Sequence, residues 1–112
     1  MLRPRIQIRN VRGIDEHREA IEDDLRTRIN NWCEPNRNVP FCARDLVGGE
    51  HTYWDGTALY HLYERNVRRL GSRRANIQAG KDVGHLLAAV LNNDRRTFET
   101  SRRWVREYRL VR

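Results

Sequence analysis

The feature that most constrains the fold of this chain is an apolar helical pattern in residues 81–92. Four apolar residues there stand at positions i, i+3, i+4 and i+7, so a helix would place them on one buried face: Val83, Leu86, Leu87 and Val90. Upstream, Ser72 is a good N-cap and Gly80 can take the left-handed conformation of a turn. We therefore predict a short helix over residues 72–79, a turn at Gly80 and a second helix over residues 81–92.

The segment that follows, residues 95–111, is rich in aromatic, β-branched and arginine residues. We predict a β-hairpin with strands over 95–100 and 104–111 and a tip at 101–103. Three apolar side chains of this hairpin would face the helices: Phe98, Tyr108 and Leu110. The alternative is a basic C-terminal helix, because a helical face would also be shared by Phe98, Val105, Tyr108 and Val111.

Two longer helices are predicted upstream, over residues 15–33 and 57–70. The first carries its apolar stripe on Ile14, Ile21, Leu25, Ile29 and Trp32, with Asp15 as a cap. The second carries its stripe on Leu59, Leu62, Tyr63, Val67 and Leu70, and Gly71 would end it. Residues 41–47 fit either a short helix or a first small strand in the sheet of the hairpin.

These elements predict one mostly α domain with a small C-terminal β-hairpin, over residues 14–112. Residues 1–13 precede it as an N-terminal arm or short strand, whose arginines could follow a phosphate backbone: Arg3, Arg5, Arg9 and Arg12. If residues 95–111 were helical, the fold would instead be all-α with a C-terminal basic helix. The loop around residues 50–56 carries Tyr53 and Trp54, which we expect to cover the edge of the core.

The whole chain has a net charge of +7, and its positive charge is concentrated in the second half. Residues 1–56 hold 9 arginines against 10 acidic residues, whereas residues 57–112 hold 12 arginines and Lys81 against 5 acidic residues. Clustered positive charge is typical of proteins that bind a polyanion, and arginine suits bidentate contacts with phosphate or guanine. The competing explanation is an arginine-rich surface that serves only solubility.

Two helices that meet at a glycine and precede an arginine-bearing hairpin resemble the second half of a winged helix-turn-helix DNA-binding domain, mainly over residues 57–112. In this resemblance Ala75 matches the small residue of the positioning helix, and Ala79 with Gly80 the turn. Residues 81–92 match the recognition helix and residues 95–111 the basic wing. The interval from Ala75 to Val83 is shorter than is usual, so either the turn is tighter or one helix runs through Gly80 with a kink.

The resemblance implies a duplex DNA-binding protein, sequence-specific or general, that acts as a small transcriptional regulator without catalytic residues or cofactors. Lys81 and His85 would read base edges, and the arginines would contact phosphates. The expected DNA-binding residues are Arg73, Arg74, Lys81, His85, Asn92, Arg95, Arg96, Arg102, Arg103 and Arg106. A homodimer on a palindromic site would be the usual way to gain specificity. No apolar run approaches the ~18 residues of a membrane span and no secretory signal is visible, so we expect a cytoplasmic protein.

Three alternatives use other residues or partners. An RNA-binding or protein-interaction module would also suit the basic half. A zinc site would draw on Cys33, Cys42, His51 and His61, but their spacing fits no zinc pattern and we expect free thiols. A small nuclease would use His51 and His61 with Tyr60 or Arg65, or a cation held by Asp45, Glu50 and Asp55.

Overall fold

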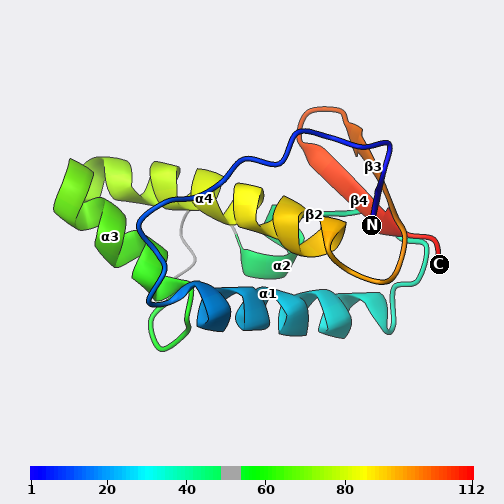
Figure 1. The fold of residues 1–112 in the computed structure, drawn as a ribbon, viewed down its shortest axis with the longest axis horizontal. Helices are drawn as coiled ribbons and strands as arrows, with labels where there is room; N and C mark the ends of the chain where they lie inside the picture. The colour runs from blue at the N-terminus through cyan, green and yellow to red at the C-terminus, as the bar shows by residue number, and fades with distance from the viewer. Residues whose placement is uncertain (49–53) are drawn as a thin grey trace.

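The computed structural model describes residues 1–48 and 54–112. Within these residues the fold has four helices and a small four-stranded sheet (Figure 1). In chain order the elements are β1 (Leu2–Arg3), α1 (Arg18–Cys33), β2 (Phe41–Cys42), α2 (Ala43–Val47), α3 (Tyr60–Leu70), α4 (Ser72–Asn92), β3 (Phe98–Arg102) and β4 (Arg106–Leu110). The prediction of a mostly helical fold with a C-terminal hairpin is confirmed. The roles predicted for Glu50, His51 and Tyr53 fall on residues 49–53, outside the described residues.

The helix α4 is continuous, so the turn predicted at Gly80 and the division into helices over 72–79 and 81–92 are wrong. Of the two alternatives for the short interval before Val83, the structure has the one in which a single helix runs through Gly80. One buried stripe crosses the glycine, with Ala75 and Ala79 before it and Val83 after it. Both halves of the stripe pack against the same core. The free energy gained by burying them outweighs the low helix propensity of glycine, so the helix continues through Gly80. The chain reverses at Gly71 instead, where a φ of 81° separates α3 from α4 by a single residue.

The C-terminal segment is a hairpin, as predicted, and the alternative of a C-terminal helix is wrong. Phe98 pairs with Leu110 and Arg102 with Arg106, which leaves Arg103–Val105 as the tip. The tip therefore lies two residues later than the predicted 101–103. Alternation decides the register, because Phe98 and Thr100 are buried while the residues on either side of Thr100 are exposed.

The sheet is completed by two short strands, in the order β1-β3-β4-β2. Residues 41–47 supply both structures that their pattern allowed: Phe41–Cys42 pairs with β4, and Ala43–Val47 forms α2 directly afterwards. The Asp45 carboxylate accepts a hydrogen bond from the Cys42 backbone N–H at 2.8 Å and so caps this short helix. Of the arm, only Leu2–Arg3 is a strand, parallel to β3, and residues 5–11 run as an ordered arm without strand pairing.

The helices α1 and α3 begin three residues later than predicted, at Arg18 and Tyr60. Asp15 does not cap α1, since its N-cap is His17, without a side-chain hydrogen bond. Leu70 was predicted to be buried in the stripe of α3, but 38% of its surface is exposed. Asn66 is fully buried in its place, because this part of α3 faces a polar contact with α4.

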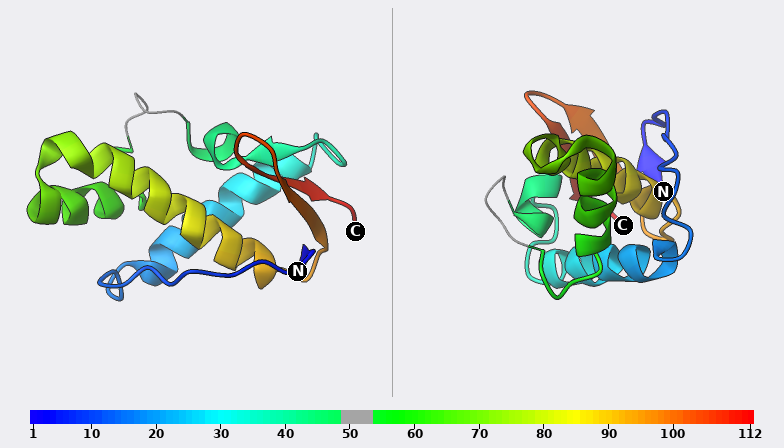
Figure 2. Two further views of the ribbon diagram at one scale, coloured as in Figure 1. Left: turned by 90° about the horizontal axis from the view of Figure 1, so that it is seen from above. Right: turned by 90° about the vertical axis from the view of Figure 1, so that its left-hand side faces the viewer.

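The core lies between α1, α4 and the sheet. Phe41, Phe98 and Tyr108 bring their rings together there, with centroids 5.8 to 6.3 Å from Phe41, and burial raises the pKa of Tyr108 to about 12. In Figure 1 and the right view of Figure 2, α1 lies on one side of α4, while the hairpin and the arm lie toward the other. The side of α4 away from α1 is therefore bordered by two irregular or β segments rather than by another helix.

Candidate nucleic-acid interface

The first half of α4 presents a long exposed surface. Its buried side is formed by Ala75, Ala79 and Val83, and its exposed residues are Ser72, Arg73, Arg74, Asn76, Ile77, Gly80 and Lys81. Three of the predicted DNA-binding residues are among them: Arg73, Arg74 and Lys81. None of these three forms an ion pair with any described residue. Gly80 and Gly84 leave the middle of this surface without side chains, so another molecule could approach the helix closely.

The other two predicted residues of this helix, His85 and Asn92, lie outside that surface. His85 is half-buried and lines a pocket beside the helix. Asn92 is exposed, but it is the last residue of α4. A helix of this length spans roughly 30 Å at 1.5 Å per residue, so Asn92 lies far from Arg73 and Arg74.

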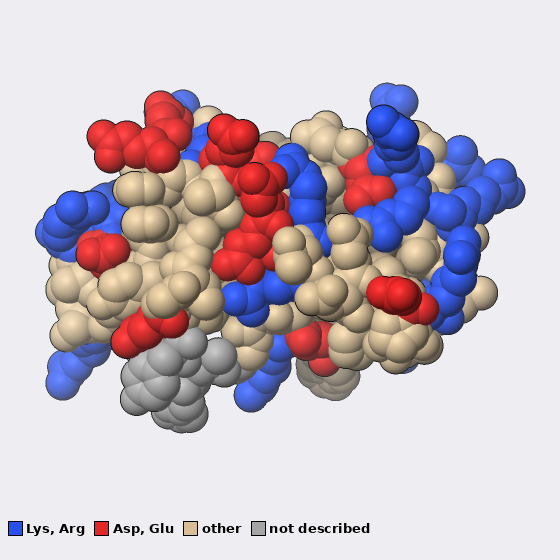
Figure 3. All heavy atoms as spheres, turned by 90° about the horizontal axis from the view of Figure 1, so that it is seen from below, with Lys and Arg blue, Asp and Glu red and all other residues tan. Residues whose placement is uncertain are grey.

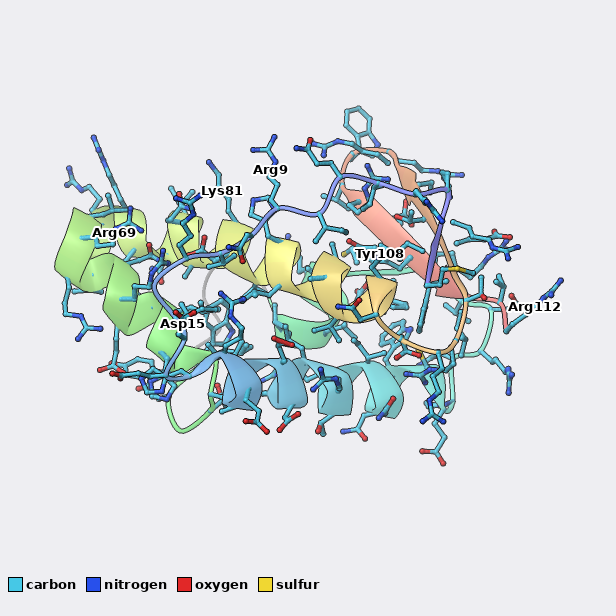
Figure 4. All side chains as sticks on the ribbon, viewed as in Figure 1. Arg9, Asp15, Arg69, Lys81, Tyr108 and Arg112 are labelled. Carbon is cyan, nitrogen blue, oxygen red and sulfur yellow. The ribbon has the colours of Figure 1, made fainter. Side chains whose placement is uncertain are left out.

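The pocket has a volume of about 400 Å³ and lies between the arm, α3 and α4. The sequence pattern did not reveal this pocket, although the arginines of the arm were considered as phosphate contacts. Its lining includes Arg9, Arg12, Arg65, Arg69 and His85. Figure 4 shows Arg9 and Lys81 along the same edge of the molecule, with Arg69 further along at the end of α3.

One carboxylate, that of Asp82, lies in the floor of this pocket with 5% of its surface exposed. It accepts hydrogen bonds from Arg65 Nη1 at 3.0 Å, Asn66 Nδ2 at 2.9 Å and Gln78 Nε2 at 3.1 Å. Arg65 is therefore neutralised within the fold, whereas Arg9, Arg12 and Arg69 form no ion pair with the described part of the chain. The pocket remains basic around a buried acid that is already satisfied.

The hairpin brings a second group of the predicted residues together. Arg102 and Arg103 are exposed at and beside the tip, and Arg106 is half-buried, with its Nη1 3.5 Å from the Thr100 hydroxyl. The side chain between them, Trp104, has 97% of its surface exposed. The tip thus combines three cations with a large apolar ring.

Arg96, one of the predicted DNA-binding residues, is engaged by the fold itself through its guanidinium. It donates to the Asp94 carboxylate at 2.9 Å and to Asn30 Oδ1 at 2.8 Å, and it lies over the Phe98 ring at 5.4 Å. Hydrogen bonding from Arg96 lowers the pKa of Asp94, and the same contact raises the pKa of Arg96. Arg96 therefore holds the connection between α4 and β3, whereas Arg95 beside it is exposed.

A group of acidic residues on and beside α1 lies on the side of the molecule away from Arg9 and Lys81. Figure 3 shows acidic side chains gathered in a band on the side of α1, and Figure 4 places Asp15 there, away from Arg9 and Lys81. The acids of α1 pair with its own arginines, Asp23 with Arg26 at 2.7 Å and Asp24 with Arg28 at 2.6 Å. The cations of α4 and of the hairpin tip are thus not neutralised by the acidic helix.

The residues of the alternative sites do not form a metal centre in the described part of the chain. Cys33 and Cys42 are free thiols, and burial raises the pKa of the Cys33 thiol. No three potential metal ligands cluster among residues 1–48 and 54–112. His61 stacks on His17 instead, with ring centroids 3.5 Å apart, a contact that the sequence pattern did not reveal.

No family model, curated protein or solved structure matches this chain. None of the helices in the described residues has both the length and the apolar content needed to cross a bilayer. The geometry of α4, the arm and the hairpin is therefore the basis for assigning a function.

Proposed function

We propose that this protein binds duplex DNA in the manner of a winged-helix domain, as a small cytoplasmic transcriptional regulator. The observation that carries the proposal is a basic face formed by the arm, the first half of α4 and the hairpin tip. We define this face by six residues without ion pairs among the described residues: Arg9, Arg73, Arg74, Lys81, Arg102 and Arg103. The proposal includes no catalytic activity, metal or cofactor.

The helix α4 suits the major groove, which is about 12 Å wide and admits one α-helix. No side chain projects from α4 at Gly80 and Gly84, so the helix backbone could approach the base edges there. Lys81 lies between these glycines and would reach a base or a phosphate, while Arg73 and Arg74 would contact phosphates. His85 would bind from the side of the arm pocket, which makes it a weaker candidate for base contacts than Lys81.

The sheet supports the comparison with a winged-helix domain. The short strand β2 pairs with the return strand β4 of the hairpin, as expected for the first small strand of a wing sheet. The hairpin would then be the wing, with its tip at Arg103–Val105. Since the predicted turn at Gly80 does not exist, α4 as a whole replaces residues 81–92 as the proposed recognition helix.

Salt-dependent titration of a labelled random-sequence duplex tests the proposal. Each phosphate contact contributes about −0.9 to the slope of log K against log salt. We expect Arg102→Ala/Arg103→Ala to bind every duplex more weakly than the parent, with a slope shallower by about 2. The matched control is Arg26→Ala/Arg112→Ala, which removes the same charge from α1 and from the far end of the chain (Figure 4).

The control should keep the slope of the parent. A parent protein that fails to bind duplex DNA at low salt would contradict the proposed function itself. An equal loss of slope in both double variants would mean that net charge, rather than the hairpin, governs binding. Tighter binding to duplex RNA of the same sequence would assign the basic face to RNA. Steeper cooperativity on a palindrome than on a half-site would support a homodimer.

A further inference from the structure

Trp104 is a large apolar side chain that does not pack against the rest of the fold. It lies at the centre of the tip with 97% of its surface exposed, and the neighbouring Val105 is 52% exposed. The other two tryptophans have structural roles: Trp54 Nε1 donates to the Val47 carbonyl at 3.0 Å, and the ring of Trp32 packs 6.0 Å from that of Phe41. An indole carries about 200 Å² of surface, whose burial is strongly favourable. The fold does not use this energy at Trp104, so it is available to a partner.

The surroundings of Trp104 define what kind of partner fits. Arg102, Arg103 and Arg106 flank it, and residues 102–106 contain no acid. The backbone N–H of Arg103 donates to the Val105 carbonyl at 3.2 Å and closes a tip of three residues. A matching partner must offer a flat apolar surface within a field of negative charge. Stacked bases between two rows of phosphates meet both requirements.

We propose that Trp104 is an aromatic wedge, which stacks its indole against a base step of the DNA bound by the basic face. This inference rests on the proposed function and adds a base contact to the hairpin. In Figure 1 and the right view of Figure 2, the hairpin tip lies beside α4 on the side away from α1. With α4 in the major groove, a tip beside it meets the neighbouring minor groove, where apolar side chains can part adjacent bases.

Pyrimidine–purine steps are the DNA steps that unstack most easily. A wedge at Trp104 therefore favours duplexes in which a TA step lies under the hairpin. The arginines beside it hold the two phosphate rows, so the base contact and the phosphate contacts come from different side chains. This separation allows each to be removed without the other.

The test compares Trp104→Ala and Trp104→Phe with the parent by anisotropy of labelled duplexes with and without TA steps. Trp104 makes no core contact that either change would remove, and circular dichroism checks the fold. We expect Trp104→Ala to weaken binding about tenfold or more, because base–aromatic stacking is worth that much, and to leave the salt slope unchanged. Trp104→Phe should retain most of the affinity. The matched control Val105→Ala removes apolar surface from the same tip and should have little effect.

Fluorescence gives an independent readout. Adding duplex should quench the emission of the parent strongly, whereas Trp104→Phe, which keeps Trp32 and Trp54, should be quenched much less. If the parent binds duplex and Trp104→Ala binds equally well without loss of quenching, the wedge is wrong and the proposed function stands. If no variant binds duplex and anionic phospholipid vesicles shift the Trp104 emission instead, the tip is a membrane contact, and both the wedge and the proposed function are wrong.

Discussion

Asp82 shows how one buried residue can join two helices. It lies in the middle of α4, and its three hydrogen-bond donors come from α3 and from the preceding turn of α4. Burying a carboxylate is costly unless cations and hydrogen-bond donors satisfy it. The sequence pattern placed Asp82 near the start of a helix, where an acid needs no partner of this kind. The tertiary structure instead makes it the link that sets α3 against α4.

Asp82→Ala should therefore destabilise the protein strongly. It would leave the guanidinium of Arg65, whose side chain is only 15% exposed, without its counter-charge. We expect the free energy of unfolding in urea to fall by about 3 kcal/mol, as for other buried pairs that lose one partner. The control Asp82→Leu/Arg65→Met removes both charges and should be less destabilised. A loss below ~1 kcal/mol for Asp82→Ala would show that the pair is not a structural link.

At the scale of elements, α4 departs most from what its residues prefer locally. Gly80 and Gly84 interrupt its helix propensity, yet the helix continues through both. The buried stripe on either side outweighs this preference, as it does in most amphipathic helices of proteins. Gly71 behaves in the opposite way, because its positive φ is required for the reversal between α3 and α4.

Gly80→Ala and Gly71→Ala should change the stability of the protein in opposite directions. At Gly80 a new Cβ would meet no atom within 4 Å and would sit in helical backbone, so the melting temperature should rise, with about 0.5–1 kcal/mol of added stability. At Gly71 the space is equally open, but the φ of 81° strains any L residue, and the melting temperature should fall. A turn at Gly80 would reverse the first result, so a lower melting temperature of Gly80→Ala would contradict a continuous α4.

For the whole molecule, the separation of charge between two sides matters more than the net charge. The fold extends 40 × 26 × 24 Å, and α1 with its acidic residues lies across α4 from the hairpin (Figures 1 and 3). Screening reduces the interaction between exposed charges beyond a Debye length, about 8 Å at physiological salt. Acids on α1 should therefore have little influence on a duplex bound at the basic face.

Neutralising these acids tests that separation. We expect Glu16→Gln/Glu19→Gln, which neutralises one acid just before α1 and one in its first turn, to change the dissociation constant for duplex DNA less than about twofold at physiological salt, with the salt slope of the parent. Lys81→Glu changes the net charge by the same amount in the opposite sense, but on the basic face, and should weaken binding about tenfold or more. Equal and opposite effects of the two variants would show that the protein acts on DNA only through its total charge.

The sequence by itself determined the elements whose signal is local. The stripe of Val83, Leu86, Leu87 and Val90 follows from the period of a helix and was predicted correctly. The hairpin and the burial of Phe98 were also predicted, from the residue types of the segment, although its tip lies two residues later than predicted. The excess of cations in the second half was equally visible. What these cations bind stays a proposal.

Only the tertiary structure decided which groups meet across the chain. It carried α4 through Gly80, paired Asp82 with Arg65, engaged Arg96 with Asp94 and left Trp104 exposed at the tip. The physical reason is that periodicity is a property of neighbouring residues, whereas burial and pairing of polar groups depend on segments distant in the sequence. Gly80 permits both a turn and a helix, and only packing against the rest of the fold selects between them.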